Sequence, residues 1–337
     1  MSRLLRLDAR VTYEPSENDH TFKAQLDKQT RMRLFWSCYI LDMLMASGVE
    51  SLTNTKMTPK VPLPCCRQDF TLGRPYDYQL LASQEYWFPD VEASRIGVEV
   101  CFVRLIYLRS YILRLIRKAS FSTDLWLEQS DFYRPIKGLQ QWMETLPEHL
   151  KFNQLNSYIQ RDQQQLSAFY AIHLLYHQTF CDLYRVVLPG YRFPIKEALK
   201  KAPRTFILEC QNACLEHAEA ISSILKSSFQ HGPEALDDPI SGVCLYESTK
   251  IQVIIGRSCS VGLPIEGWDC ILGNVMTNLR GVDQCCAHLG WGSLLVNDRV
   301  MQSSGSVQSI RDNYSLEAKI WVSQDRIPPL PPNPPRD

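Results

Sequence analysis

Apolar residues recur along this chain at the spacing of an α-helix, and they never sustain the alternate-residue pattern of a half-buried strand. Val91–Lys118 and Arg204–Phe229 place apolar side chains three and four residues apart, which predicts two amphipathic helices. Further helices are predicted over Asp131–Thr145, Asp162–Leu188, Pro239–Ile255 and Asp269–Leu289. No repeat of fixed period interrupts the pattern. The sequence therefore predicts an all-α fold.

The stretch Arg31–Glu50 predicts a helix that is apolar on nearly every side. Its apolar positions are Leu34, Phe35, Trp36, Tyr39, Ile40, Leu41, Met43, Leu44 and Met45. Asp27 is the expected N-cap, and Gly48 is expected to end the helix. Because a helix of this kind must be enclosed by other elements, we expect it at the centre of the fold. A rigid VPLP segment follows at 61–64, and an ordered loop with short turns is expected over Cys65–Asp90.

Residues 1–290 are expected to form one multi-helix domain with ordered loops rich in proline and aromatic residues. Residues 291–337 contain a Ser/Gly-rich spacer and then the segment IPPLPPNPPRD, so a flexible, disordered tail is expected there. Pro331, Pro334 and Arg336 fit the PxxPxR pattern of peptides that bind SH3 domains. Tails rich in proline match this pattern often by chance, and a plain disordered tail is the favoured interpretation.

Charge and composition narrow the classes of function. The chain has 337 residues with 36 basic and 36 acidic side chains, so its formal net charge is zero. A protein that binds nucleic acid through bulk electrostatics normally has a basic excess. No segment reaches the roughly 18 consecutive apolar residues of a membrane helix. We therefore expect neither a membrane protein nor a chain that binds DNA by itself.

The 12 cysteines are expected to be reduced and buried. No apolar run of signal-peptide length follows Met1, and free cysteine is among the residues most often found in protein cores. A binuclear zinc cluster needs paired CxxC units, and the sequence contains none. Cys65–Cys66 and Cys285–Cys286 are adjacent pairs, which do not suit a structural zinc site.

Candidate chemistry is sparse, and we expect no catalytic, cofactor-binding, metal or DNA-binding residue in this chain. His173, His177 and Cys181 are spaced four apart on one predicted helix face, but Leu174 stands where a zincin has its glutamate. Packing is the favoured interpretation of these three side chains. Asp237–Asp238 lacks the third carboxylate of an aspartate-rich metal motif, so a helical enzyme is the less favoured alternative.

The arginines of one predicted helix suggest an anion site at first sight. They are Arg104, Arg109, Arg114 and Arg117. Their spacing scatters them around the helix, so solvated positions and local ion pairs are expected instead.

Four segments, in order, resemble the middle homology region of the fungal zinc-cluster transcription factors. They are RMRLFWSCYILD with VPLPCC, HLLYHQTFCDLYRVVLPGYRFP, ECQNACLEHAEAISSIL and DDPISGVCLYESTKIQVI, and the similarity runs from about Asp27 to Leu289. The sequence departs from the family at Met32 and Met43, where arginine is usual.

The resemblance implies an all-helical regulatory domain of a nuclear factor that controls RNA polymerase II genes. Its implied partners are the transcription machinery or co-regulator proteins, and a homodimer is left open. Zinc and DNA would be bound only by an N-terminal cluster, which is expected to be missing here through truncation. A stand-alone helical protein that competes with full-length relatives is the alternative.

Overall fold

The computed structural model describes residues 22–48, 59, 61–74, 96–118, 120–121, 124–258 and 265–288, without the side chains of 257–258, 265–268 and 286–288. Every regular element within these ranges is a helix, which confirms the predicted all-α class. The predicted tail over 291–337 and most of the predicted loop over 65–90 lie outside the described residues.

The helices follow one another along the chain as follows. The α-helices are α2 (Phe22–Ala46), α3 (Arg67–Leu72), α4 (Val98–Leu115), α5 (Tyr133–Glu144), α6 (Gln154–Asp162), α7 (Leu166–Tyr184), α8 (Lys196–Leu199), α9 (Arg204–Ser228), α10 (Pro239–Ser258) and α11 (Ile265–His288). The short 3-10 helices are Glu148–Leu150, Arg185–Val187, Phe229–His231 and Pro233–Leu236.

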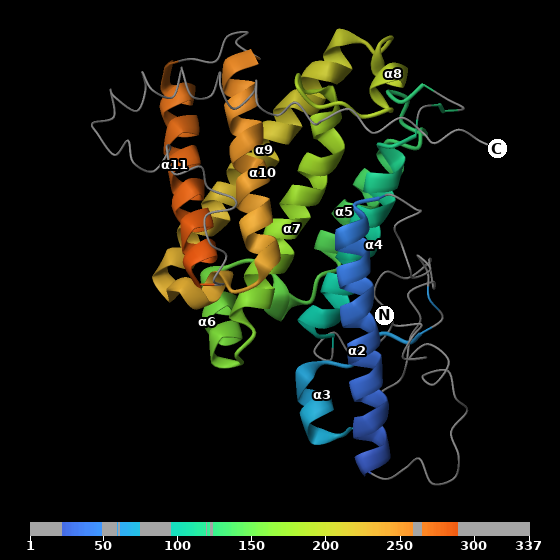
Figure 1. Cartoon of the computed structure of the whole chain (residues 1–337), viewed down its shortest axis with the longest axis vertical. Helices are drawn as coiled ribbons and strands as arrows, with labels where there is room; N and C mark the ends of the chain where they lie inside the picture. The colour runs from blue at the N-terminus through green and yellow to red at the C-terminus, as the bar shows by residue number, and fades with distance from the viewer. Residues whose placement is uncertain are drawn as a thin grey trace, which may run out of the picture.

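Helix α7 is the central element of the fold. It packs against α4 on one side and against α9 and α10 on the other, with α11 beyond them at the outer edge (Figure 1). Its sequence is apolar on nearly every side, and residues Phe169–Tyr176 are all buried. A helix of that composition is stable only when other helices enclose it. Helix α7 therefore occupies the central position that the sequence predicts for the helix after Asp27.

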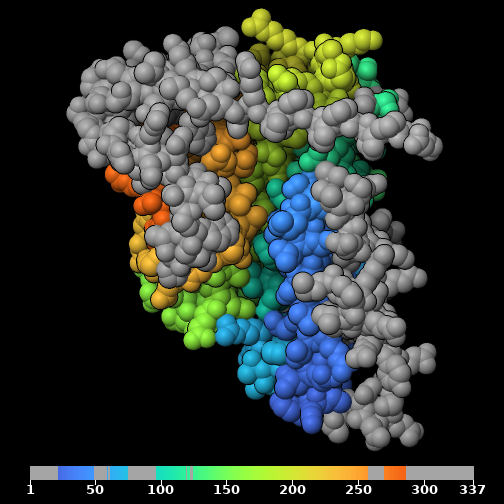
Figure 2. Space-filling view, viewed as in Figure 1, coloured from blue at the N-terminus to red at the C-terminus, as the bar shows by residue number. Residues whose placement is uncertain are grey.

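Helix α2 lies at one edge of the described fold, so the prediction that it is enclosed is wrong. One face, including Trp36 and Tyr39, is buried against its neighbours, of which α4 is the main one. On the other face, the exposed fractions are 45% for Leu34, 60% for Leu41 and 74% for Met45. Helix α2 accordingly forms part of the molecular surface in the space-filling view (Figure 2). Apolar composition alone did not show which of two apolar helices is enclosed.

The start of α2 also differs from the prediction. The helix already begins at Phe22, and Asp27 is an interior residue rather than the N-cap. Its carboxylate lies 2.7 Å from the guanidinium of Arg31, one turn further along the helix. Such i,i+4 pairs support a helix and so favour continuing it through this point.

The VPLP segment runs back along α2. The indole N–H of Trp36 donates a 2.7 Å hydrogen bond to the carbonyl oxygen of Pro62, while Val61 and Leu63 are buried. The following residues 67–72 form the short helix α3, where only a loop was predicted. Cys66 caps α3 through its sulfur, which accepts a hydrogen bond from the backbone N–H of Asp69.

The predicted helix over Asp162–Leu188 is shorter in the structure, where α7 covers Leu166–Tyr184 and the 3-10 helix Arg185–Val187 follows it directly. Helix α6 ends at Asp162 and α7 begins at Leu166, with Gln164 between them at a φ of 56°. Helices α6 and α8 were not predicted. The remaining predicted helices are confirmed as α4, α5, α9, α10 and α11, although α4 starts only at Val98, after the extended Gly97.

Gly48 allows the chain to leave α2 close to the backbone of α4. Its φ is 82°, and an added Cβ would lie 2.6 Å from the carbonyl carbon of Leu113. Gly190 has a nearly identical φ of 85°, but nothing lies within 4 Å of an added Cβ. Substitution of Gly190 therefore tests the conformational cost of a Cβ at positive φ alone, whereas substitution of Gly48 adds a steric clash with α4.

We expect Gly190→Ala to lower the free energy of unfolding by about 1–2 kcal/mol, the cost of a left-handed conformation for a residue with a Cβ. Gly48→Ala has the same conformational cost and must also displace the backbone of α4, so its loss should exceed that of Gly190→Ala by at least about 2 kcal/mol. Urea denaturation of the two variants measures the difference. Equal losses would contradict the close approach of Gly48 to Leu113.

Candidate functional site

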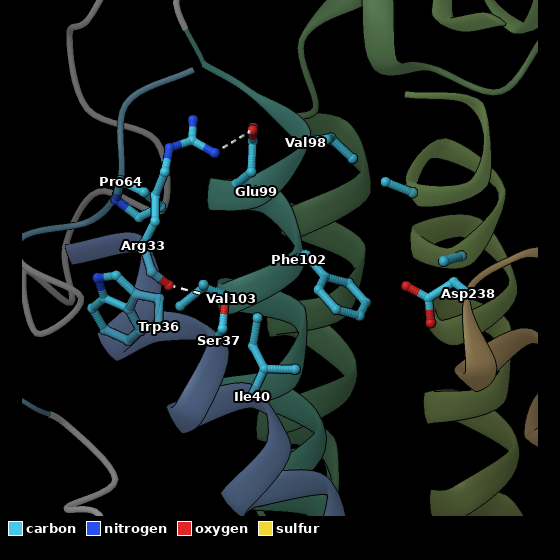
Figure 3. A pocket seen from close by; sticks show the side chains of 12 residues that line it. Arg33, Trp36, Ser37, Ile40, Pro64, Val98, Glu99, Phe102, Val103 and Asp238 are labelled. Atoms are coloured by element: carbon cyan, nitrogen blue, oxygen red, sulfur yellow. Dashed lines mark hydrogen bonds and ion pairs between the residues drawn. The ribbon is translucent and has the colours of Figure 1, made fainter. Parts of the chain in front are cut away.

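A pocket of about 140 Å³ lies where α2 and α4 meet α7 and the start of α10 (Figure 3). Most of its wall is apolar. The apolar side chains that the argument uses are Ile40, Phe102, Val103, Ala168 and Ala171. The two alanines belong to α7, and their small size leaves room opposite the larger side chains of α2 and α4. The pocket is therefore lined by helices that are far apart in the sequence.

Arg33 of α2 forms the polar rim of the pocket together with Glu99. Its guanidinium lies 3.1 Å from the carboxylate of Glu99 in the first turn of α4 and donates a 2.8 Å hydrogen bond to the carbonyl oxygen of Cys65. The same guanidinium lies 4.5 Å from the ring centroid of Phe70 on α3. Arg33 thus connects α2 to α4, to the end of the VPLP segment and to α3.

Asp238 faces the pocket from the opposite side. It directly precedes Pro239, the first residue of α10, and its carboxylate accepts a 3.0 Å hydrogen bond from the backbone N–H of Ile240. This is the arrangement of an N-cap aspartate followed by proline. Burial raises the pKa of Asp238, while the hydrogen bond from Ile240 opposes that shift. In Figure 3 the carboxylate points toward Phe102.

A second group of charged side chains lies between α4, α7 and α10. At its centre, the fully buried carboxylate of Asp182 lies 2.8 Å from Nε of Arg109 and 2.8 Å from Nη2 of Arg185. Gln178 donates a further hydrogen bond of 3.0 Å to Asp182. Arg185 also pairs with Glu247 of α10 at 2.6 Å. We call Arg109, Asp182, Arg185 and Glu247 the charge cluster.

The charge cluster keeps Arg185 ionised in a buried position. Although burial disfavours the charged guanidinium, the negative charges of Asp182 and Glu247 raise the pKa of Arg185. The guanidinium also lies 5.2 Å and 5.5 Å from the ring centroids of Tyr191 and Phe193. Charge pairing and ring contacts together compensate for the hydration that Arg185 loses.

The expectation of solvated arginines is wrong for two of the four positions on α4. Arg104 is only 3% exposed, and the side chain of Arg109 is 12% exposed within the charge cluster. Arg117 is exposed, and it donates a 3.0 Å hydrogen bond to the carbonyl oxygen of Ser47 after α2. The arginines do lie on different sides of α4, but neighbouring helices cover more than one of these sides.

His173, His177 and Cys181 share one region of α7 but have different partners. His173 hydrogen-bonds the carbonyl oxygen of Leu150 at 2.9 Å, and the Sγ of Cys181 lies 3.7 Å from the carbonyl oxygen of Cys214. His177 meets the ring of His217 on α9, with 2.9 Å between their Nδ1 atoms. Within the described residues, no three His, Cys, Asp or Glu side chains are arranged to hold a metal ion.

The His177–His217 pair is held neutral by its surroundings. Burial, and then the neighbouring His217, lower the pKa of His177 to about 3. Burial lowers the pKa of His217 to about 4. One ring must donate and the other accept in their mutual hydrogen bond, and two neutral imidazoles satisfy this condition.

The cysteines of the described ranges are free thiols, and most of them are buried. The buried ones are Cys65, Cys101, Cys181, Cys210, Cys214, Cys244 and Cys285. Burial raises the pKa of Cys210 to about 12 and that of Cys65 to about 11. Because the thiolate is the reactive form, these side chains act as packing residues.

Comparison with known proteins finds similarity to fungal transcription factors over most of the chain. The Zn(2)-C6 fungal-type transcription factor FTF1c of Fusarium oxysporum f. sp. lycopersici is 22% identical over 335 residues, which cover 95% of this chain and 34% of that protein. The factor FTF1a of the same fungus is 20% identical over 339 residues, covering 96% and 30%. The chain is a homologue of Zn(2)-C6 fungal-type transcription factors. The family resemblance expected from the four sequence segments is thereby confirmed.

The matched region covers only part of each relative. An uncharacterized transcriptional regulatory protein of Schizosaccharomyces pombe is 25% identical over 195 residues, covering 52% of this chain and 28% of that protein. The chain spans about a third of the length of the Fusarium relatives it matches. No protein-family model and no solved structure matches it. Among the described helices, none has the length and apolar character needed to cross a bilayer.

The polar residues of the pocket and the charge cluster were not predicted from the sequence. The cluster joins Arg109 to Asp182, which are 73 positions apart, so no local pattern indicates their contact. Asp238 offered a usable signal, because aspartate followed by proline is typical of a helix start. No local sequence pattern indicates the role of Arg33, because its partner Glu99 lies 66 positions away.

We expect Asp182→Asn to lower the free energy of unfolding by about 3–5 kcal/mol, because it leaves two buried guanidinium groups without their shared counter-charge. Glu197→Gln is the matched control, since it removes a carboxylate from the exposed pair with Lys200 and should change stability by less than about 1 kcal/mol. Denaturant unfolding measures both variants. A small loss for Asp182→Asn would contradict the role of the charge cluster.

The histidine pair predicts a loss of stability in weak acid. An unfolded histidine has a pKa of 6.5, and the folded values for His177 and His217 lie below it. Protons therefore bind preferentially to the unfolded chain below pH 6.5, and each histidine lowers stability by up to about 1.4 kcal/mol per pH unit. His217→Gln should make this slope shallower between about pH 6.5 and 5. An unchanged slope in the variant would disprove the assignment.

Proposed function

We propose that this chain is the regulatory part of a nuclear fungal transcription regulator of RNA polymerase II genes. The observation that supports the proposal is its homology, over 95% of its length, to Zn(2)-C6 fungal-type transcription factors. Its all-helical architecture agrees with such a domain. The sequence contains no CxxC pair that could form a zinc cluster. Zinc and DNA would accordingly be bound by a part of the protein that these 337 residues do not include.

In this proposal the domain acts through protein partners of the transcription apparatus. The exposed face of α2 supports this role, because Leu34, Cys38, Leu41 and Met45 follow one another at spacings of four, three and four and so share one side of the helix. Leu41 and Met45 are mostly exposed there. Apolar residues gathered on one exposed helix face are typical of surfaces that bind another protein.

The alternative is a stand-alone helical protein that competes with full-length relatives for such partners. It is favoured by the same absence of CxxC pairs from the sequence. The transcript upstream of Met1 separates the two possibilities. An in-frame segment with paired CxxC units supports the regulatory part of a larger factor, and a confirmed start at Met1 supports the competitor.

Fusion of the chain to an unrelated DNA-binding domain tests the regulatory function. We expect the fusion to raise or lower transcription of a reporter in a fungal nucleus, relative to the DNA-binding domain alone. The unfused chain should form no competitor-resistant complex with DNA at physiological salt, since its net charge is zero.

Leu41→Glu with Met45→Glu is the variant that addresses the partner surface, because both side chains are exposed and the substitution should leave the fold intact. The reporter response of the fusion should fall in this variant. A stable, nuclear fusion that leaves the reporter unchanged would overturn the proposed function. A specific DNA complex of the unfused chain would overturn the proposal that DNA is bound outside these 337 residues.

A further inference from the structure

We propose that the pocket between α2, α4, α7 and the start of α10 binds a small organic amine, whose ammonium group pairs with Asp238 while its apolar body contacts Phe102 and Ile40. The inference deepens the proposed function and rests on it for biological meaning, because it names the class of effector that the regulatory domain would bind. Binding itself can be measured without any transcriptional readout.

The size of the pocket suits a molecule of about one ring. Its volume of about 140 Å³ is close to the roughly 150 Å³ of an engineered protein cavity that binds benzene. Phe102 extends from α4 toward Asp238 (Figure 3), and the small side chains of Ala168 and Ala171 on α7 also line the pocket. An aromatic or cyclic group can therefore lie between the ring of Phe102 and the backbone of α7.

The charges around the pocket favour a cation over an anion. Arg33, the basic residue of the wall, is already paired with Glu99 and donates to the carbonyl oxygen of Cys65. These two opposite charges cancel at the rim. The carboxylate of Asp238 remains, and no basic side chain of the described ranges forms an ion pair with it. The formal charge of the side chains that line the pocket is thus negative.

The geometry of Asp238 leaves it able to accept another donor. Its Oδ1 accepts the N–H of Ile240 at the start of α10, and no described residue donates to Oδ2. The carboxylate is directed into the pocket toward Phe102 (Figure 3). A partly buried carboxylate without a counter-charge is unfavourable, and an ammonium group would supply both the charge and the missing donor. The adjacent ring of Phe102 also attracts a cation.

Other polar groups of the wall are already engaged or lie at the rim. Ser37 donates to the carbonyl oxygen of Arg33 within α2, and the indole N–H of Trp36 donates to Pro62. They therefore offer no competing donor for a ligand anion. A neutral apolar molecule would fit the apolar wall but would leave the carboxylate of Asp238 without a counter-charge.

Calorimetric titration of the whole chain with benzylamine tests the inference, and benzyl alcohol is the neutral probe of the same shape. We expect benzylamine to bind at least about 10-fold more tightly, the effect of one charge-assisted hydrogen bond. Asp238→Asn should abolish this preference, since asparagine keeps the N-cap but lacks the charge. Asp124→Asn, which removes an exposed carboxylate elsewhere, should keep it. Ala168→Leu, which fills the pocket from its edge, should weaken both probes.

Three results would overturn the inference. They are equal affinities for the two probes, an undiminished preference for benzylamine in Asp238→Asn, and no benzylamine binding by the folded wild-type chain at millimolar concentration. None of them depends on the reporter fusion. Failure of amine binding with an active fusion would refute the ligand class alone, while an inactive fusion with intact amine binding would refute the regulatory function alone.

Discussion

The buried carboxylate of Asp182 is the constraint on which the arrangement of the core helices depends. It is fully buried and pairs with Arg109 of α4 and with Arg185, the first residue of the 3-10 helix after α7. Arg185 also pairs with Glu247 of α10. Buried ion pairs add little net stability compared with apolar residues, but removal of one partner is very unfavourable. The charge cluster therefore fixes how the three helices lie relative to one another, since sliding any of them would separate buried charges.

The pocket follows from that arrangement. Phe102 belongs to α4 and Asp238 to the start of α10, so the space between them is set by the same helices that the charge cluster holds. Helix α2 closes the remaining side, and it is attached mainly through α4 and through the pair of Arg33 with Glu99. A ligand in the pocket would contact the outer helix and the core together, which is what an effector site in a regulatory domain requires.

The sequence predicted the helices with strong periodicity, and it failed where the outcome depends on distant residues. Leu34, Leu41 and Met45 of α2 are as apolar as the residues of α7. Other helices nevertheless bury only α7 on nearly every side, while these three side chains of α2 are exposed. Gly281 lowers the helix propensity of α11 but allows close packing, because an added Cβ would lie 2.7 Å from a methyl group of Leu225. The charge cluster and the pocket join segments far apart in the chain, and local patterns contain no information on such contacts.

Amide hydrogen exchange of the native chain tests most directly whether the charge cluster unites the core. If it does, the slowest amides of α4, α7 and α10 will exchange with one common free energy of opening, equal to that of global unfolding. Exchange of α10 at a clearly lower free energy than α7 would contradict the account, because the pairing of Arg185 with Glu247 would then not hold these helices together.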